Sequence, residues 1–545
     1  MAKKRTLVVF LACLMVLTLA TQSAMACTIY GVGKNATTDG STIVTHNDDS
    51  SSADFRLWII PAMEGGPDAK RDIVIDSHNY GDFGQYPAVK DYGKGTLIAE
   101  MDQPEDSIPY FHSRYSFLNA KGVATSESTF NINKKTEYGA KVFDLIYGKN
   151  DGLIDCWNAQ DIGLERASTA REFVEIVGDV IETYLWRDPG ETLLISDGNE
   201  LWIMEAYGLD LWCAIKVPDD ALIVAANRAR IQEFNFEDTE NYLCSANFKS
   251  FAVDNGLWSE DSGEPFSPAD LYAPSDDYLY ASRRVWRSFD LVAPGQNFDS
   301  TADRFPLWVT PEEKLSVQDV FELTGDYYEG TEYDVSRTAM AGDYGNPLNV
   351  NNKERTINLF RTCYVMIAHT KNWLPDEAKS LVWYGYGAPD STFLTPLWAS
   401  MTRLPEIYQR GNRYEDFTRD SGWWINSYVQ QIATINYDYA IELIHERRGQ
   451  RMDEQYEFVA QLQETAAQLI RDGKKDMAVK LLTDYACNNA EEWFDIWLKL
   501  GDELLGDLMW GTIAMRNPGY SDWYKDIVNN AEMKPIVEPT EAPKN

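Results

Sequence analysis

Cys27 is the residue of this 545-residue chain whose position most directly indicates chemistry. The chain begins with three positive charges at positions 3–5, continues with an apolar run over residues 8–20, and then reads Ala24-Met25-Ala26. This order is typical of a secretory signal peptide that ends in a small-residue cleavage site. Cleavage after Ala26 would leave Cys27 as the first residue of the mature protein.

An N-terminal cysteine combines a nucleophile and a base in one residue. Its α-amine has a pKa of about 7.7–8.0 and its thiol one of about 8.5, so proton transfer from thiol to amine is nearly balanced. Such a residue needs no catalytic histidine and stays inactive until cleavage frees the amine. Two other interpretations remain open. Cys27 could be an ordinary residue after the cut, or a lipidated anchor, although lipoprotein signals usually carry Leu where this chain has Ala24.

The composition argues against several classes of partner. The net charge is −36, with 85 acidic against 49 basic residues, which disfavours binding to nucleic acids or to anionic membrane surfaces. No second apolar run approaches the roughly 20 residues of a membrane span. Aromatic residues make up 13% of the chain, which indicates an aromatic core and leaves an aromatic-lined cleft as the alternative.

The other cysteines are scattered and include no Cys-x-x-Cys pair. This argues against a structural zinc cluster and against a disulfide framework. One or two disulfides stay open in an oxidising compartment. Cys213 and Cys363 stand among apolar residues, which predicts buried thiols at both positions.

Two segments predict β-hairpins. Residues 28–32 and 42–45 are rich in β-branched side chains and are separated by Asp39-Gly40, which is a turn signal. Residues 193–195 and 201–204 repeat this pattern around Asp197-Gly198-Asn199. A strand that starts directly after Cys27 would hold this residue at the end of a sheet and keep the mature terminus from fraying.

Residues 27–49 read CTIYGVGKNATTDGSTIVTHNDD. This segment resembles the opening of the C69 dipeptidase family, which is part of the N-terminal nucleophile hydrolase superfamily. Further segments resemble the same family in the same order, among them 122–129, 226–231 and 354–357, so the resemblance extends from Cys27 to about residue 424. It implies an α+β fold, namely an αββα sandwich of two antiparallel sheets flanked by helices.

The resemblance also implies roles for single residues. Asp49 would bind and orient the α-amine of Cys27, and Asn227 would donate a hydrogen bond to the oxyanion. Relatives often carry Arg at the position of His46, so a permanent positive charge beside the thiol is replaced here by a group that titrates. A solvated polar turn around Asp49 and a turn-forming role of Asn227 are the structural alternatives.

His46, Glu127 and Arg228 are the candidates for substrate binding. Glu127 could bind a substrate amine, and Arg228 could bind a substrate carboxylate by bidentate pairing. The arginine-rich run 283–287 offers the same chemistry as Arg228. In so acidic a chain, such arginines more often form internal ion pairs.

Four regions are predicted along the chain: a signal peptide (1–26), the hydrolase domain (27–425), a helical extension packed on it (426–535) and a disordered tail (536–545). Residues 456–482 are rich in helix-forming residues, and Asp472-Gly473 marks a break between two helices.

These observations predict a secreted or periplasmic cysteine peptidase that hydrolyses dipeptides or short peptides through an acyl-enzyme. Neither a metal nor an organic cofactor is implied, and the expected partner is a short peptide substrate. Self-association into a homo-oligomer stays open. The alternatives are an acylase of the bile-salt or penicillin V type, acting on non-peptide amides, and a lipidated binding protein anchored at Cys27.

Overall fold

A computed structural model describes residues 27–50, 55–63, 69–75, 96–104, 106–149, 151–276, 278–349, 354–411 and 416–530. The predicted signal peptide and the predicted disordered tail lie outside these residues. In the part of the chain that is described, no helix is both long and apolar enough to cross a membrane.

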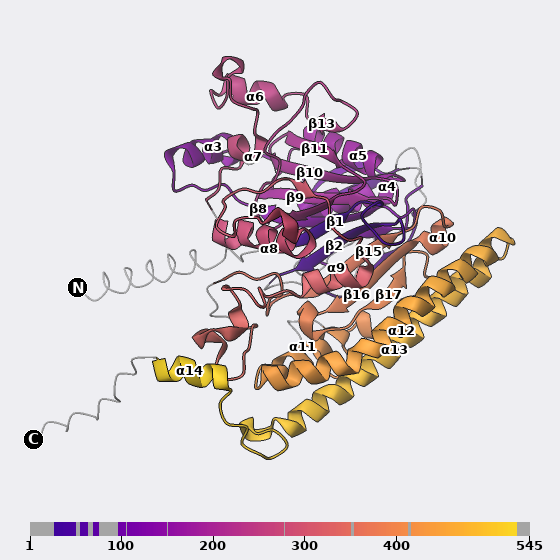
Figure 1. Cartoon of the computed structure of the whole chain (residues 1–545). Coiled ribbons are helices and arrows are strands. Elements are labelled where there is room, and N and C mark those ends of the chain that lie inside the picture. The colour runs from indigo at the N-terminus through magenta and orange to yellow at the C-terminus, as the bar shows by residue number, and fades with distance from the viewer. Residues whose placement is uncertain are drawn as a thin grey trace, which may run out of the picture.

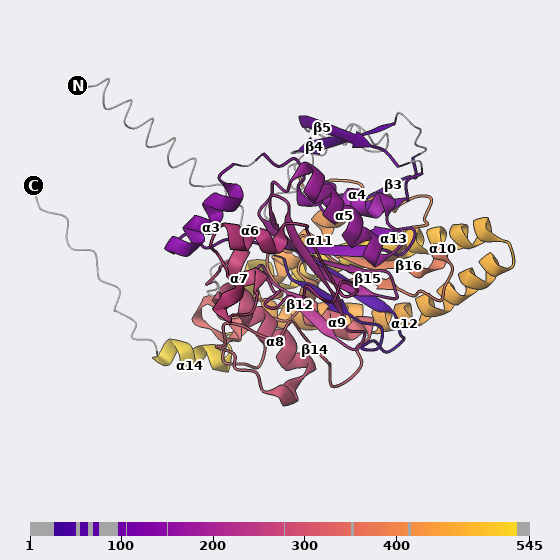
Figure 2. The ribbon, with the colours of Figure 1, turned by 90° about the horizontal axis from the view of Figure 1, so that it is seen from above.

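Two antiparallel sheets form the centre of the molecule (Figure 1). In spatial order, the seven-stranded sheet consists of β14 (Trp308–Val309), β12 (Leu222–Ala225), β1 (Ile29–Val32), β2 (Thr42–Asp48), β15 (Tyr364–Thr370), β16 (Ser380–Tyr386) and β17 (Thr395–Trp398). The eight-stranded sheet consists of β13 (Tyr242–Cys244), β11 (Leu211–Val217), β10 (Leu201–Gly208), β9 (Gly190–Ser196), β8 (Ala124–Phe130), β7 (Leu118–Asn119), β6 (Tyr110–His112) and β3 (Trp58–Ile60). A separate ribbon of β4 (Lys70–Ile75) and β5 (Thr96–Asp102) is visible from above (Figure 2).

Both predicted hairpins are confirmed. Strands β1 and β2 pair with Gly31 opposite Val44, and Gly40 between them has a φ of +84°, which favours glycine. Strands β9 and β10 are joined by a turn in which the Asp197 carboxylate accepts hydrogen bonds from the backbone of Asn199 (2.7 Å) and Glu200 (2.9 Å). An aspartate that caps its own turn in this way fixes the register of the two strands.

Side chains of the eight-stranded sheet alternate between two apolar layers, as the pleat of a strand requires. Leu194 and Ile203 face the core shared with the seven-stranded sheet. Leu193, Trp202 and Met204 face a second core. That second core is completed by α4 (Cys156–Arg166) and α5 (Ala170–Tyr184), which cover the outer face of this sheet.

Helices also cover the outer face of the seven-stranded sheet. On β16, Trp383 contacts Tyr456 of the long helix α12, with ring centroids 4.6 Å apart. Phe393, just before β17, stacks on Trp493 of α13 at 4.9 Å. The helices of this layer are α9 (Val317–Thr324), α11 (Gly422–Ala433), α12 (Tyr437–Arg471) and α13 (Lys475–Asp507). The succession of helices, sheet, sheet and helices confirms the predicted αββα fold class (Figure 1).

The C-terminal helices follow the sequence pattern closely. Helix α12 ends at Arg471 and α13 begins at Lys475, so Asp472-Gly473 is the break, and Gly473 has a φ of +75°. Whether the hydrolase domain ends near residue 425 stays a prediction. Further helices are α3 (Glu137–Tyr147), α6 (Phe248–Asp254), α7 (Pro268–Tyr272), α8 (Arg283–Val292), α10 (Asp376–Lys379) and α14 (Asp522–Asn530).

Candidate active site

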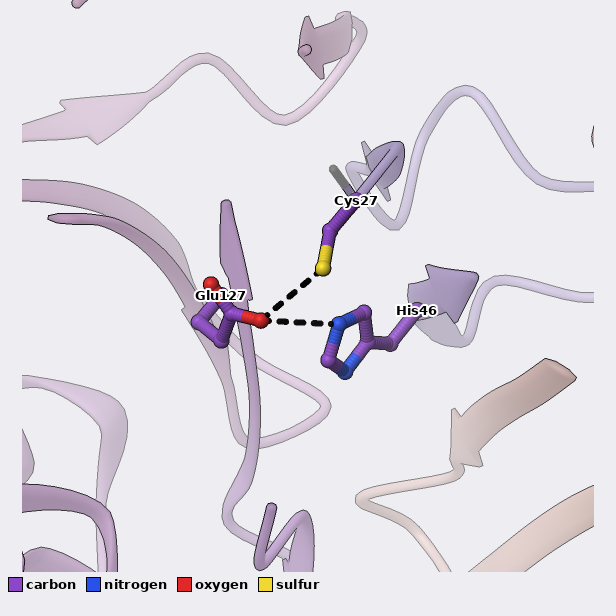
Figure 3. A group of neighbouring side chains, drawn as sticks. All are labelled: Cys27, His46 and Glu127. Carbon is purple, nitrogen blue, oxygen red and sulfur yellow. Dashed lines mark hydrogen bonds and ion pairs between the residues drawn. The ribbon is translucent and has the colours of Figure 1, made fainter. Parts of the chain in front are cut away.

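Three of the predicted site residues, Cys27, His46 and Glu127, meet between the two sheets (Figure 3). The Cys27 Sγ donates a hydrogen bond to Glu127 Oε1 at 3.0 Å. His46 Nε2 lies 3.2 Å from the same carboxylate oxygen. All three side chains are buried. A thiol, an imidazole and a carboxylate therefore converge on one point that is shielded from bulk water.

The sheet topology explains why these residues meet. Cys27 stands directly before β1, and His46 lies on the neighbouring strand β2. The backbone N–H of Asn47 donates to the carbonyl of Thr28 at 3.0 Å, which holds the Cys27 end of the chain against β2. Glu127 comes from β8 of the opposite sheet. The site therefore exists only when the two sheets are packed on each other.

Glu127 is held as a carboxylate inside the protein. Burial alone would raise its pKa, but the hydrogen bond and charge of His46, followed by hydrogen bonds from Glu191 and Cys27, lower the pKa to about 2. The opposite holds for Glu191, whose pKa is raised by burial and by the negative charge of Glu127. Thr129 bridges the two acids, since its hydroxyl lies 2.8 Å from Glu191 and 3.4 Å from Glu127. The two acids of this buried pair therefore differ in proton affinity, and Glu191 is the weaker acid.

The thiol of Cys27 is kept in its protonated form in the full-length chain. Burial raises its pKa well above the ordinary value, and the charges of Glu127, Asp48 and Asp49 raise it further. A thiol that stays protonated is a weak nucleophile, because the thiolate is the attacking form.

The two aspartates after His46 have different environments. One Asp49 oxygen forms an ion pair with Arg355, and the other accepts a hydrogen bond from the Thr362 hydroxyl. Asp48 shares the face of β2 with His46, because side chains two residues apart point the same way. Its Oδ2 is buried and has no hydrogen-bond partner among the described residues. Burial raises the pKa of Asp48 to about 7, although His46 and Arg114 act to lower it.

Asn227 is held against β8 beside the site. It has a φ of +60°, a left-handed conformation that Asn tolerates better than most residues. Its backbone N–H donates to the Ser128 hydroxyl at 2.8 Å, and its side-chain Nδ2 donates to the Thr129 carbonyl at 2.9 Å. The amide is therefore fixed and keeps a second N–H. The oxyanion role stays a prediction.

Arg284 is a contributor that the sequence did not single out from its arginine-rich run. Its fully buried guanidinium donates to the Cys27 carbonyl at 2.8 Å and to the Thr28 hydroxyl at 2.9 Å. It also donates to Asn227 Oδ1 at 2.7 Å. Helix α8 thereby ties the Cys27 backbone to Asn227. No feature of the local sequence separates Arg284 from Arg283 and Arg287 beside it.

Arg228 forms internal contacts instead. Its guanidinium pairs with both carboxylate oxygens of Asp303, at 2.8 and 3.0 Å, and donates to the Ser275 carbonyl at 2.9 Å. These bonds match the alternative of an internal ion pair, and they give the predicted substrate-binding role no support.

Two tyrosines that the sequence did not indicate lie beside His46. The rings of Tyr115 and Tyr364 pack edge-on against the imidazole, and their centroids lie 5.3 and 5.5 Å from its centroid. The Tyr364 hydroxyl lies 3.3 Å from His46 Nδ1. The imidazole is therefore oriented, with its Nε2 aimed at Glu127 and Cys27.

No disulfide joins two cysteines of the described residues. Cys213 and Cys363 are buried, as predicted. The disulfides that the sequence left open are thus absent from the described part of the chain.

Comparison with known proteins decides the family. Residues 26–449 match the model of Peptidase family C69. The chain belongs to this family. The predicted family and the predicted enzyme class, a cysteine peptidase, are both confirmed.

Curated relatives of this C69 peptidase align over most of their length. Probable dipeptidase B of Lactococcus lactis subsp. lactis (strain IL1403) is 24% identical over 436 residues, covering 77% of this chain and 83% of the relative. Probable dipeptidase of Latilactobacillus sakei is 27% identical, covering 76% and 82%. Dipeptidase of Bifidobacterium longum (strain NCC 2705) is 26% identical over 450 residues, covering 78% and 81%.

The site of this C69 peptidase holds the groups that amide hydrolysis requires. It contains a thiol, a carboxylate anion within hydrogen-bond distance of that thiol, and an anchored amide that keeps a donor. Cys27, His46 and Glu127 also form a set of sulfur, nitrogen and oxygen atoms that lie within 4.8 Å of one another and could hold a metal ion.

Proposed function

We propose that this C69 peptidase is a secreted dipeptidase that hydrolyses dipeptides or short peptides, with Cys27 freed as its N-terminal nucleophile. The observation that carries the proposal is the hydrogen bond of the Cys27 thiol to a buried carboxylate, at the residue that directly follows the signal-type cleavage motif. The curated relatives named as dipeptidases support the substrate class.

In the proposed reaction, the free α-amine of Cys27 takes the thiol proton and the thiolate attacks the scissile carbonyl carbon. A bond from sulfur to carbon forms and the carbonyl electrons move to oxygen, where the second N–H of Asn227 stabilises the charge. The carbon–nitrogen bond then breaks, and the departing amine takes the proton from the Cys27 ammonium. Water, deprotonated by the same amine, cleaves the thioester and releases the acid.

Processing would act as the switch of this reaction. While Ala26 is attached, the nitrogen of Cys27 is a peptide nitrogen and accepts no proton. Burial and the nearby carboxylates keep the thiol pKa high. Only the cleaved chain would supply an α-amine that can accept the thiol proton and then carry a positive charge beside the thiolate.

Asp48 is better suited than Asp49 to hold the new ammonium group. Asp49 already has Arg355 and Thr362 as partners, one at each oxygen. Asp48 offers a buried oxygen that lacks a partner among the described residues, and its charge acts on the Cys27 thiol more strongly than that of Asp49. We assign the ammonium to Asp48, and to Asp49 the task of holding Arg355.

Glu127 suits the binding of the substrate's own α-ammonium. In an amino acid, the α-nitrogen lies about 2.5 Å from the carbonyl carbon. A carboxylate 3.0 Å from the attacking sulfur is therefore within reach of the N-terminal amine of the residue that is attacked. This arrangement favours substrates cleaved after their first residue, as dipeptides are.

The test compares the chain that starts at Cys27 with the same chain retaining Ala26. We expect the first to hydrolyse unprotected dipeptides and to form an acyl-enzyme on Cys27 visible by intact mass, and the second to be inactive. Equal activity of the two forms would contradict the proposed base. Faster turnover of N-acylated amides than of free dipeptides would favour the acylase alternative, and a lipid on Cys27 would favour the anchored binding protein.

A further inference from the structure

We propose that the mature site binds one Zn²⁺ ion through Cys27, His46 and Glu127 and that this ion reversibly blocks the peptidase. The inference rests on the proposed function, because its fourth ligand is the α-amine freed by removal of the signal peptide. Zinc acts here as an inhibitor of the site and is not a cofactor of the reaction.

The spacing of the three side chains fits a tetrahedral ion. Zinc bonds of about 2.0–2.3 Å at tetrahedral angles place neighbouring ligand atoms about 3.3–3.5 Å apart. Here Glu127 Oε1 lies 3.0 Å from Cys27 Sγ and 3.2 Å from His46 Nε2, and all three atoms lie within 4.8 Å of one another. The two separations that involve Glu127 therefore differ from those of a tetrahedral site by a few tenths of an ångström, and the three groups point toward one another (Figure 3).

His46 is prepared as a ligand on both of its nitrogens. Its Nε2 is buried, points at the cluster and lies 3.2 Å from Glu127 Oε1. Its Nδ1 faces the Tyr364 hydroxyl at 3.3 Å. A histidine that binds a metal through one nitrogen is commonly oriented by a hydrogen bond to the other.

Cleavage before Cys27 would supply the fourth ligand. The nitrogen and the sulfur of one cysteine are joined by three bonds, so both can bind the same ion in a five-membered ring. With Ala26 attached, that nitrogen is an amide whose lone pair is delocalised. The mature chain would therefore offer two nitrogens, one sulfur and one oxygen, a set that zinc accepts and that calcium and magnesium do not prefer. Binding releases the thiol proton, and any proton on the amine, to solvent.

Zinc bound in this way removes both working parts of the proposed reaction. The sulfur could no longer attack, and the amine could no longer accept a proton. Asp48 and Asp49 act on the Cys27 thiol electrostatically, so their negative charges also favour a cation at this position. A chelator would restore activity, because no covalent bond of the protein changes.

The experiment titrates the metal-free chain that starts at Cys27 with Zn²⁺ by calorimetry and with Co²⁺ by absorption spectroscopy. We expect one ion per chain and a thiolate-to-cobalt charge-transfer band. His46→Gln should weaken binding at least about tenfold. The matched control is His445→Gln, since His445 bonds to Asp390 in another part of the molecule, and it should leave binding unchanged. Thermal unfolding shows whether each variant is folded.

The chain that retains Ala26 is a second control that keeps every side chain of the site. It should bind Zn²⁺ at least about tenfold more weakly than the mature chain, because one ligand is missing. Equal binding by the two forms, or no effect of His46→Gln in a folded protein, would overturn the inference.

Activity measurements separate this inference from the function on which it rests. A mature protein that hydrolyses dipeptides and is not inhibited by stoichiometric Zn²⁺ would overturn the zinc inference and leave the proposed function intact. A metal-free mature protein that binds Zn²⁺ but hydrolyses no dipeptide would overturn the proposed function, and the inhibitory role with it. Inhibition that EDTA reverses is the result we expect.

Discussion

Two buried clusters of this protein contain the same kinds of side chain but differ in how their charges are matched. In the first, beneath α4, Arg71 donates to Glu165 at 3.0 Å and lies 3.7 Å from Asp161, while His112 Nδ1 lies 3.3 Å from Asp161. In this first cluster the pKa of Asp161 is lowered, because His112, Arg71 and Ser116 outweigh the effect of burial. Each acid of the first cluster therefore has a cationic partner. The second cluster is the group around Cys27.

The Cys27 cluster instead pushes the pKa values of its acids apart. The pKa of Glu127 is lowered to about 2, that of Asp48 is raised to about 7, and those of Glu191 and of the Cys27 thiol are raised. A matched cluster stabilises a fold, whereas groups with divergent proton affinities in one place are characteristic of sites that move protons. The Cys27 cluster is therefore distinguished by acids whose pKa values diverge, and not by the number of charged groups that it contains.

The largest expected effect is a loss of catalysis without a loss of stability when Cys27 is replaced. Cys27→Ala should lower kcat/KM for dipeptides by at least about 10⁴-fold, because it removes the attacking atom. The free energy of unfolding should change by less than about 1 kcal/mol, since His46 remains as a partner for Glu127. Enzyme kinetics and urea unfolding of the mature chain measure the two quantities. Residual activity near that of the wild type would place the nucleophile elsewhere.

The opposite pattern is expected for Glu165→Ala in the matched cluster. It should lower the free energy of unfolding by about 3–5 kcal/mol, because it leaves Arg71 buried with one partner fewer. The folded fraction should keep its kcat/KM, since Glu165 accepts hydrogen bonds from Arg71 and Arg166, which are not part of the Cys27 cluster. Urea unfolding at pH 7 measures the first effect. A loss of kcat/KM without a loss of stability would break the distinction between the clusters.

The pH dependence of stability tests the mismatch directly. With a folded-state pKa of about 7 against about 3.9 in the unfolded chain, Asp48 stabilises the fold fully only below pH 4 and loses this contribution as the pH rises through 7. The free energy of unfolding of Asp48→Asn minus that of the wild type should therefore rise by about 2–3 kcal/mol between pH 5 and pH 8. Urea unfolding of the chain that retains Ala26 measures this without a competing ammonium group. A pH-independent difference would contradict the raised pKa.

The smallest expected effect distinguishes the two neighbouring aspartates in the mature chain. Asp48→Asn should lower kcat/KM about tenfold and move the alkaline or acid limb of its pH profile, because the ammonium loses its carboxylate. Asp49→Asn should instead lower stability, because Arg355 loses its ion pair. A shifted pH profile in Asp49→Asn alone would return the ammonium to Asp49.

Sequence patterns predict the features of this protein that depend on local chain. The strand after Cys27, the turn at Asp39-Gly40 and the helix break at Asp472-Gly473 all follow from residue types within a few positions. Family resemblance adds Glu127, which lies 100 positions from its thiol partner. Neither approach predicts the partners of Arg284, Arg355 and Thr362, because the packing of distant segments sets them. The sequence also does not distinguish Asp48, which we propose as the partner of the ammonium, from Asp49, since which of two adjacent acids faces the site depends on strand register.

The central position of β1 has a consequence for biosynthesis. This strand is the first one in the described part of the chain, yet it lies between β2 and β12, and its pairing of Ile29 with Ala225 spans nearly two hundred residues. Contacts of such sequence separation form late, because long loops must close first. Cys27 is therefore synthesised long before the strands that form its site have folded around it. Ribosome-bound or truncated fragments would be harmless to other peptides, and hydrolytic competence would arrive only with the last strands of the sandwich.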